Sequence, residues 1–124
     1  MGLAFFVPLL ATRIGRCLMR YLVVTKQTTP MPPEMVPGLF AAMKAFSDRY
    51  TESGKVEQSW SFAGLSGGGA ILNVGSLEEL DEIMAEFPLG PFSHIEIYGL
   101  VHLHKSLDTA SKAFEAMTGG MAQH

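Results

Sequence analysis

The pattern of apolar and polar positions in the first half of the chain predicts a strand followed by a helix. Residues 21–25 are rich in β-branched side chains, which is typical of a strand. Three prolines between Thr28 and Pro33 prevent a regular ladder and predict a stiff loop. Residues 34–53 then repeat apolar side chains at helical spacing, and Gly54 follows where a C-terminal cap is expected. The apolar face of this helix consists of Leu39, Met43, Phe46 and Tyr50.

The next segment predicts a β-hairpin. Residues 56–62 alternate between apolar and polar, as in a half-buried strand. The side expected to be apolar consists of Val56, Gln58, Trp60 and Phe62. The Ser-Gly-Gly-Gly run at 66–69 predicts the turn, because glycine adopts positive φ without steric cost. Residues 70–74 predict the returning strand.

A second helix, a fourth strand and a C-terminal helix complete the pattern. Ser76-Leu-Glu-Glu79 is a capping box, and the helix that it opens is expected to run to about Phe87. Pro88 and Pro91 end that helix. Residues 93–103 predict the fourth strand, and residues 106–117 predict a helix ahead of a loose Gly-Gly tail.

The order of these elements predicts the fold class. It is β-α-β-β-α-β, which is typical of an α+β, ferredoxin-like domain with one four-stranded antiparallel sheet. Both helices are then expected on one face of the sheet, and the other face is uncovered. An uncovered face with apolar positions is usually buried by a second copy, so we expect a homodimer or a higher homo-oligomer.

Composition and charge exclude several classes of protein. The net charge of −3 argues against nucleic acid as a partner, because the chain offers no basic stripe. The single cysteine, Cys17, excludes an internal disulfide and a cysteine-only metal site, and it fits a cytoplasmic location. The apolar share of 48% is high for a chain of 124 residues, which again favours a subunit interface.

Residues 1–18 are predicted to be an extension ahead of the domain. Their apolar run at 2–11 is too short to span about 30 Å of hydrocarbon. A secretory signal carries its positive charges before the apolar run, whereas here the arginines come after it. Three interpretations stay open: a weakly ordered extension, a segment that docks onto a partner subunit, and attachment to a membrane surface, which is the least favoured. The domain itself is expected at 19–118, with a flexible tail at 119–124.

Three segments of the chain resemble the muconolactone Δ-isomerase family. They are Trp60-Ser-Phe-Ala-Gly64, Ser76-Leu-Glu-Glu-Leu80 and Phe87–Leu100. The turn that contains Pro88 and Pro91 and leads into Ile95-Glu-Ile97 is the most specific of them. The resemblance covers roughly 85 residues and implies a dimeric α+β barrel that assembles further. It also implies an enzyme that isomerises an unsaturated lactone by proton transfer, with neither a metal nor a cofactor.

The chain departs from this family where charged residues are expected. The first helix carries Ala42, Met43 and Ala45 in place of acidic residues and keeps only Lys44. Glu57 and Gln58 stand where the family has an arginine-histidine pair. The last strand runs into Val101-His-Leu-His-Lys105 instead of a His-Pro. Proton transfer needs a positioned acid–base group, and several positions that could supply one are changed.

Histidines on the predicted fourth strand are one source of such a group. Alternation places His94, Glu96, Tyr98, His102 and His104 on one face. This face is expected at a subunit interface or in solvent, or it supplies His102 or His94 as a general acid–base, since histidine titrates near neutral pH. Two imidazoles do not complete a zinc site, so no metal is expected.

The remaining candidates are polar or aromatic residues at unusual positions. Gln58 lies on an apolar face and needs hydrogen-bond partners, from a ligand or from the backbone. Lys26 ends the first strand and either reaches the rim or contacts a substrate. Trp60 is expected in the core or as the wall of a pocket. Lys44 is either an exposed lysine or stabilises an anionic intermediate.

These features together predict a cofactor-free isomerase acting on an unsaturated lactone, a cyclic acid or a ketone. Lys44 and His102 are the candidate catalytic residues, and Lys26, Gln58, Trp60 and His94 are the candidate substrate-binding residues. The alternatives are a non-catalytic oligomeric domain that binds a small ligand, and a cofactor-free monooxygenase or decarboxylase on the same fold. Fold alone does not separate these functions.

Overall fold

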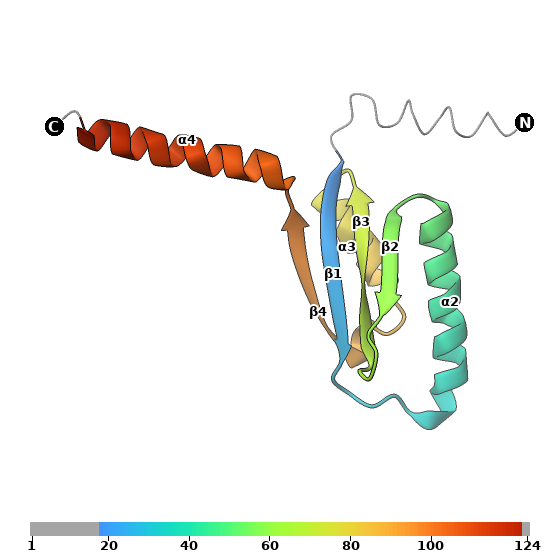
Figure 1. Cartoon of the computed structure of the whole chain (residues 1–124). Helices are drawn as coiled ribbons and strands as arrows, with labels where there is room; N and C mark the ends of the chain where they lie inside the picture. Colours follow the sequence, from blue (N-terminus) through green and yellow to red (C-terminus); the bar gives the residue numbers. More distant parts are fainter. Residues whose placement is uncertain (1–17, 123–124) are drawn as a thin grey trace, which may run out of the picture.

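Four strands form one antiparallel sheet in the order β2-β3-β1-β4 (Figure 1). The computed structural model describes residues 18–122, and residues 1–17 of the predicted extension at 1–18 lie outside the described residues. The strands are β1 (Met19–Gln27), β2 (Val56–Ser61), β3 (Gly67–Val74) and β4 (Ser93–Leu100). The predicted ferredoxin-like order is confirmed, because the two central strands, β1 and β3, are each followed by a helix that leads to an edge strand.

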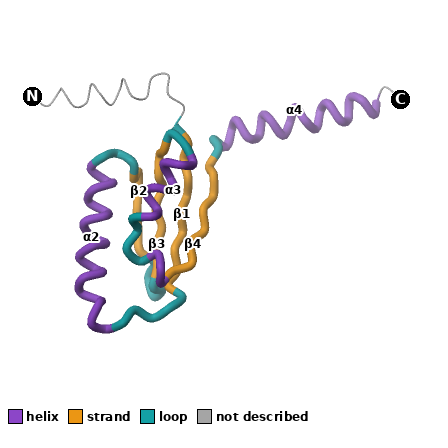
Figure 2. Tube along the Cα trace, turned by 180° about the vertical axis from the view of Figure 1, so that it is seen from behind, coloured by secondary structure: helices purple, strands orange, loops and turns teal. Residues whose placement is uncertain are grey.

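Two helices, α2 (Val36–Glu52) and α3 (Leu77–Ala85), cover one face of this sheet, as predicted (Figures 1 and 2). Short 3-10 turns at Pro33–Met35 and Gly90–Phe92 lead into α2 and β4. A third helix, α4 (Leu103–Ala122), projects away from the sheet (Figure 1). No helix of the part that the structure describes is long and apolar enough to cross a membrane.

The core lies between the sheet and the two covering helices. Its buried cluster consists of Val23, Leu72, Val74, Tyr50, Leu80 and Ile83. Phe46 packs edge-on against both Tyr50 and Phe87, with ring centroids 5.0 and 5.7 Å apart, and so joins α2 to the end of α3. The predicted apolar face of the first helix is therefore the face that packs on the sheet.

The capping residues predicted from the sequence are found at the ends of both covering helices. The Ser76 hydroxyl accepts a hydrogen bond from the Glu79 amide at 3.1 Å, which caps α3. The Glu79 carboxylate in turn accepts from the Gly75 amide at 2.7 Å and forms an ion pair with Lys55. Gly54 has φ of +85° and ends α2, because glycine adopts this backbone conformation without strain.

The hairpin turn is not where the glycine run predicted it. The turn spans residues 62–66, and Gly67, Gly68 and Gly69 belong to β3 itself. These glycines lie in the strand because β2 approaches β3 too closely there for side chains. A Cβ built on Gly69 would lie 2.9 Å from Cζ2 of Trp60, and one built on Gly68 would meet the Trp60 carbonyl. The glycines therefore let β2 and the Trp60 side chain lie against β3.

The end of the fourth strand was also predicted wrongly. β4 ends at Leu100, and α4 begins at Leu103 instead of Ser106. From Leu103 onward, residues 103, 107, 110, 114 and 117 repeat apolar side chains at a spacing of four and three, which is a helical period and not a strand period. The helix also continues through Gly119 to Ala122, where a flexible tail was predicted.

Candidate functional site

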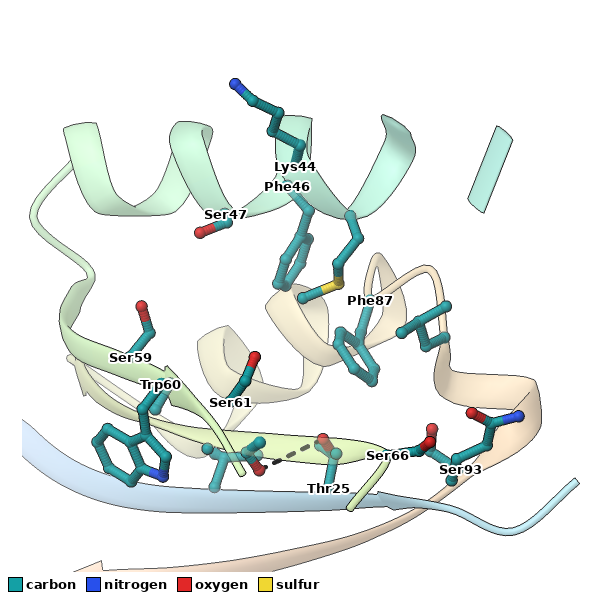
Figure 3. Close-up of a pocket in the computed structure, with 18 of the residues that line it drawn as sticks. Thr25, Lys44, Phe46, Ser47, Ser59, Trp60, Ser61, Ser66, Phe87 and Ser93 are labelled. Carbon is teal, nitrogen blue, oxygen red and sulfur yellow. Dashed lines mark hydrogen bonds between the residues drawn. The ribbon is translucent and has the colours of Figure 1, made fainter. Parts of the chain in front are cut away.

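A cavity of about 760 Å³ lies between α2 and the helix-covered face of the sheet (Figure 3). Its volume falls within the range of roughly 300–1,000 Å³ that is typical of small-molecule sites. The lining comes from α2, from the β2–β3 hairpin, from β1, and from the proline-bracketed segment after α3. The segment that carries the specific family resemblance therefore contributes to the lining of the cavity.

The apolar walls of the cavity combine aromatic rings and thioethers with aliphatic side chains. The phenylalanines are Phe40, Phe46, Phe87 and Phe92, and the methionines are Met31, Met43 and Met84. Phe87 is buried, whereas Phe40 is 56% exposed. Methionine side chains adapt to ligands of different shape, so these walls suit an apolar ring compound.

Hydroxyl groups supply most of the polar lining. Ser47 on α2 points toward the sheet, and Ser59 and Ser61 on β2 point toward α2 (Figure 3). Thr25 on β1 donates a long hydrogen bond of 3.5 Å to the Gly68 carbonyl. Ser66 and Ser93 line the same cavity (Figure 3). A hydroxyl both donates and accepts hydrogen bonds, so this lining can hold a carbonyl or a hydroxyl oxygen.

The charged lining of the cavity consists of Lys44 and Asp48, within the residues that the structure describes. Both lie on α2, four residues apart, and both are exposed. Residues at this spacing are neighbours on the surface of a helix. The Lys44 side chain points away from the sheet (Figure 3). The structure thus places this predicted residue at the rim, with its ammonium directed outward.

A β-bulge decides which residues of β2 reach the cavity. The pairing register of β2 with β3 shifts between Val56, which pairs with Leu72, and Gln58, which pairs with Ile71. Because side chains alternate along a strand, the shift moves all later residues of β2 to the opposite face. Ser59 and Ser61 therefore face α2. The predicted apolar face, with Gln58 in register with Val56, is wrong for this reason.

The predicted substrate-binding residues gather on the open face of the sheet instead. Gln58 is exposed there, and the Trp60 indole lies against Gly69 on the side of β2 away from the helices (Figure 3). Trp60 is 38% exposed and contributes to the edge of the cavity lining, so it is not a core residue. Lys26 pairs with His94 across β1 and β4 on the same open face.

A small polar cluster surrounds His94 on this open face. Its ring nitrogen Nε2 lies 3.3 Å from Glu96, and the Tyr98 hydroxyl donates to Glu96 at 2.8 Å. These hydrogen bonds, from Tyr98 and then from His94, lower the pKa of Glu96 below its usual value. The same contact raises the pKa of Tyr98. The predicted grouping of His94, Glu96 and Tyr98 on one face agrees with these contacts.

His102 lies outside both the strand and the cavity. It belongs to the linker between β4 and α4, and it borders a second, smaller depression beside Tyr21 and Gly99. Its ring centroid lies 5.7 Å from that of His104, which is on α4. Among the described residues, no group of three metal-binding side chains is present.

Several lining residues were missed by the sequence interpretation. Ser59 and Ser61 fall between the positions of the predicted apolar side of their strand, and neither Ser47 nor Asp48 was singled out as a candidate. The alternation that contains Ser59 and Ser61 is visible in the sequence, but the bulge that reverses its direction is not. Asp48 lies at the edge of the apolar face of α2. At such a position, the spacing of apolar residues does not show whether a side chain lines the cavity or points into solvent.

Contacts between α2 and the end of α3 fix the position of the cavity wall near Met84 and Phe87. The Tyr50 hydroxyl and the Arg49 guanidinium both donate to Oε1 of Glu86 at 2.7 Å, and Arg49 lies over the Tyr50 ring at 5.0 Å. The hydrogen bond to Glu86 and then burial raise the pKa of Tyr50 above its ordinary value. This contact fixes the C-terminal end of α2 against the end of α3, next to Met84 and Phe87.

The geometry describes an α+β, ferredoxin-like protein with a small-molecule cavity between helix and sheet. The family model of muconolactone delta-isomerase matches residues 19–106, and the chain belongs to this family. It is 34% identical to the muconolactone delta-isomerase of Rhodococcus opacus over 70 residues, which are 56% of this chain and 75% of that protein. A crystal structure of muconolactone isomerase matches with a TM-score of 0.61 and 28% identity, over 68% of this chain and 90% of the other.

Proposed function

We propose that this chain is a cofactor-free isomerase that binds an unsaturated lactone or a cyclic ketone in the cavity beneath α2. The observation that carries the proposal is the presence of a cavity of about 760 Å³, lined by rings and hydroxyls, in a member of the muconolactone isomerase family. A relative and a structural neighbour are both named as muconolactone isomerases, which supports the reaction class.

Asp48 is the best-placed group to move the proton. It is the carboxylate of the cavity lining, within the described part of the chain, and it lies at the mouth on α2. A carboxylate removes the proton next to a carbonyl, and the hydroxyls of Ser59 and Ser61 hydrogen-bond to the oxygen on which negative charge then develops. Return of the proton to another carbon of the conjugated system completes the isomerisation. Lys44, one turn away, lies beside it at the rim with its ammonium directed away from the sheet.

The test is the incorporation of deuterium from heavy water into α-angelica lactone, a neutral unsaturated lactone, monitored by NMR. We expect exchange and conversion to the conjugated isomer, and we expect Asp48→Asn to slow them by about 100-fold or more. The matched control is Asp108→Asn, an equally conservative change on α4 away from the cavity. Equal rates for Asp48→Asn and the wild type would contradict the assignment of Asp48, and absence of any exchange with a panel of lactones and ketones would contradict the isomerase.

A non-catalytic binding protein is the second candidate. It is favoured because the lining offers few acid–base groups. In the described part of the chain, the charged residues of the cavity are Lys44 and Asp48, and both are exposed. A stable complex with a lactone, measured by calorimetry, in the absence of deuterium exchange would support this function over the enzyme.

The proposal includes assembly into a homodimer or a higher homo-oligomer. The open face of the sheet carries an apolar centre of Leu22, Val24, Ile71, Trp60 and Tyr98. Polar contacts flank this centre, including the bidentate pair of Arg20 with Glu57 at 2.9–3.0 Å. Apolar patches with a polar rim are typical of subunit interfaces. A cytoplasmic location, inferred from the single cysteine, is part of the same proposal.

Light scattering after size exclusion tests the assembly. Tyr98 is 49% exposed in the single chain, so Tyr98→Asp is expected to leave the protomer folded and to shift the protein toward a monomer. The matched control is Leu107→Asp on α4, which is 56% exposed and lies off the sheet. A wild-type protein that remains monomeric at micromolar concentration would contradict an interface on the open face.

A further inference from the structure

We infer that the cavity accepts a neutral, mainly apolar cyclic compound with a carbonyl or hydroxyl oxygen, and that it rejects carboxylates. The inference rests on the proposed function in one respect, since it places the ligand in the same cavity. It narrows the substrate class to neutral lactones and cyclic ketones, and it excludes the cyclic acids that the sequence alone allowed.

The distribution of charge around the cavity carries this inference. An anion that leaves water needs a cation or several strong donors at its new position, because burial of an unpaired charge is costly. The cation of the lining is Lys44, and its ammonium points away from the sheet (Figure 3). The other charged group is the Asp48 carboxylate at the mouth, which repels an incoming carboxylate. No further charged side chain lines the cavity between residues 18 and 122.

The polar groups inside are suited to an uncharged oxygen. Ser47 approaches from α2 and Ser59 and Ser61 from β2, so hydroxyls face the cavity from both walls (Figure 3). Ser47 is half-buried, and the other two serines are exposed in the protomer, so a ligand can reach all three hydroxyls. Each is therefore free to donate to a ligand carbonyl or to accept from a ligand hydroxyl.

The walls and the size define the rest of the ligand. Phe46 packs edge-on against Phe87 with centroids 5.7 Å apart, and Met43 and Met84 add to the apolar surface. A volume of about 760 Å³ is larger than a single five-membered ring requires. A flat compound of two or more fused rings, with one oxygen directed at the serines, fits this arrangement.

Calorimetry with a matched pair of probes tests the inference. The probes are coumarin, a neutral fused-ring lactone, and coumarin-3-carboxylate, the same ring system with a negative charge at pH 7. We expect coumarin to bind at least tenfold more tightly, and we expect the double variant Ser59→Ala/Ser61→Ala to weaken coumarin at least fivefold. Ser111→Ala on α4 is the matched control and should change neither affinity. A preference for the carboxylate, equal affinities, or no binding of coumarin at millimolar concentration would overturn the inference.

Two variants examine the role of charge directly. Ser61→Lys places an ammonium inside the cavity and is expected to reverse the preference in favour of the carboxylate. Lys44→Met should leave both affinities unchanged, and it serves as a second measurement if Ser61→Lys does not fold. If Lys44→Met selectively weakens the carboxylate at least fivefold, Lys44 reaches the ligand and the inference is wrong.

The binding assay and the exchange assay separate this inference from the proposed function. Preferential binding of coumarin without deuterium exchange into any lactone would support the preference for neutral ligands and contradict the proposed isomerase activity. Exchange into a carboxylate-bearing lactone, but not into its neutral counterpart, upholds the isomerase and overturns the neutral class.

Discussion

The indole of Trp60 lies directly on Gly69, so closely that a Cβ at position 69 would stand 2.9 Å from Cζ2 of the ring. Trp60 belongs to the edge strand β2 and Gly69 to its neighbour β3, and the two residues are paired in the sheet. The absence of a side chain at Gly69 therefore allows a large ring to lie flat on the open face. The neighbouring Ser59 and Ser61 are turned toward the cavity by the same register.

We expect Gly69→Ala to destabilise the fold by about 1–3 kcal/mol, which is the usual cost of overpacking. The new methyl must displace the Trp60 ring, because three ring atoms lie within 3.0 Å of its position. Urea denaturation measures the change. Gly38→Ala is the control: no atom lies within 4 Å of a Cβ there, and alanine in a helix is expected to stabilise by about 0.5–1 kcal/mol. Similar effects of the two substitutions would contradict the contact between Trp60 and Gly69.

Glu79 is expected to make stability depend on pH in the acid range. Its pKa is lowered first by the hydrogen bond from the Gly75 amide and then by Lys55. A carboxyl group with a lowered pKa in the folded state stabilises that state above its unfolded pKa, near 4.5, and loses this contribution as pH falls through the folded value. The difference in unfolding free energy between wild type and Glu79→Gln should therefore be largest near pH 7 and shrink below pH 4.5. Glu78→Gln, on the exposed side of the same turn, is the control. A difference that stays constant down to pH 2 would rule out this linkage.

Tyr50 is expected to give a corresponding dependence in the alkaline range. Its pKa is raised by the hydrogen bond to Glu86 and by burial. A tyrosine with a raised pKa stabilises the folded state below its unfolded pKa of about 10, and that contribution is lost as pH rises toward the folded value. Tyr50→Phe should lower the free energy of unfolding by about 1 kcal/mol at pH 7, and by less above pH 10. The measurement is thermal unfolding at several pH values, with Tyr21→Phe as the control. An effect of Tyr50→Phe that grows with pH would have the wrong sign.

Removal of residues 107–124 is expected to leave the sheet folded. The side chains of α4 are exposed along the described part of the helix, including Leu107 at 56%, Phe114 at 64% and Met117 at 64%. Circular dichroism should show loss of helix signal with little change in the midpoint of thermal unfolding. Truncation before Ser93, which also removes β4, should abolish the cooperative transition because β4 pairs with β1 along its whole length. A large fall in the midpoint for the shorter truncation would show that α4 supports the domain in solution.

The order of strands and helices could be predicted from the chain alone because each element carries its own period and its own stop signal. The stripe of Leu39, Met43, Phe46 and Tyr50, the cap at Ser76 and the prolines at 88 and 91 act over a few residues, and local interactions of this kind are readable in sequence. The same holds for the resemblance around Pro88 and Pro91, which the family model at 19–106 confirms.

The composition of the site was decided by tertiary structure. One bulge between Val56 and Gln58 reverses the faces of β2, so that serines line the cavity while Gln58 and Trp60 lie on the open face. The bulge arises from pairing with a distant strand, and a shift of one residue moves every later side chain to the other side of the sheet. Sequence alone determined that β2 has two different faces; only its pairing with β3 determined which of them meets the ligand.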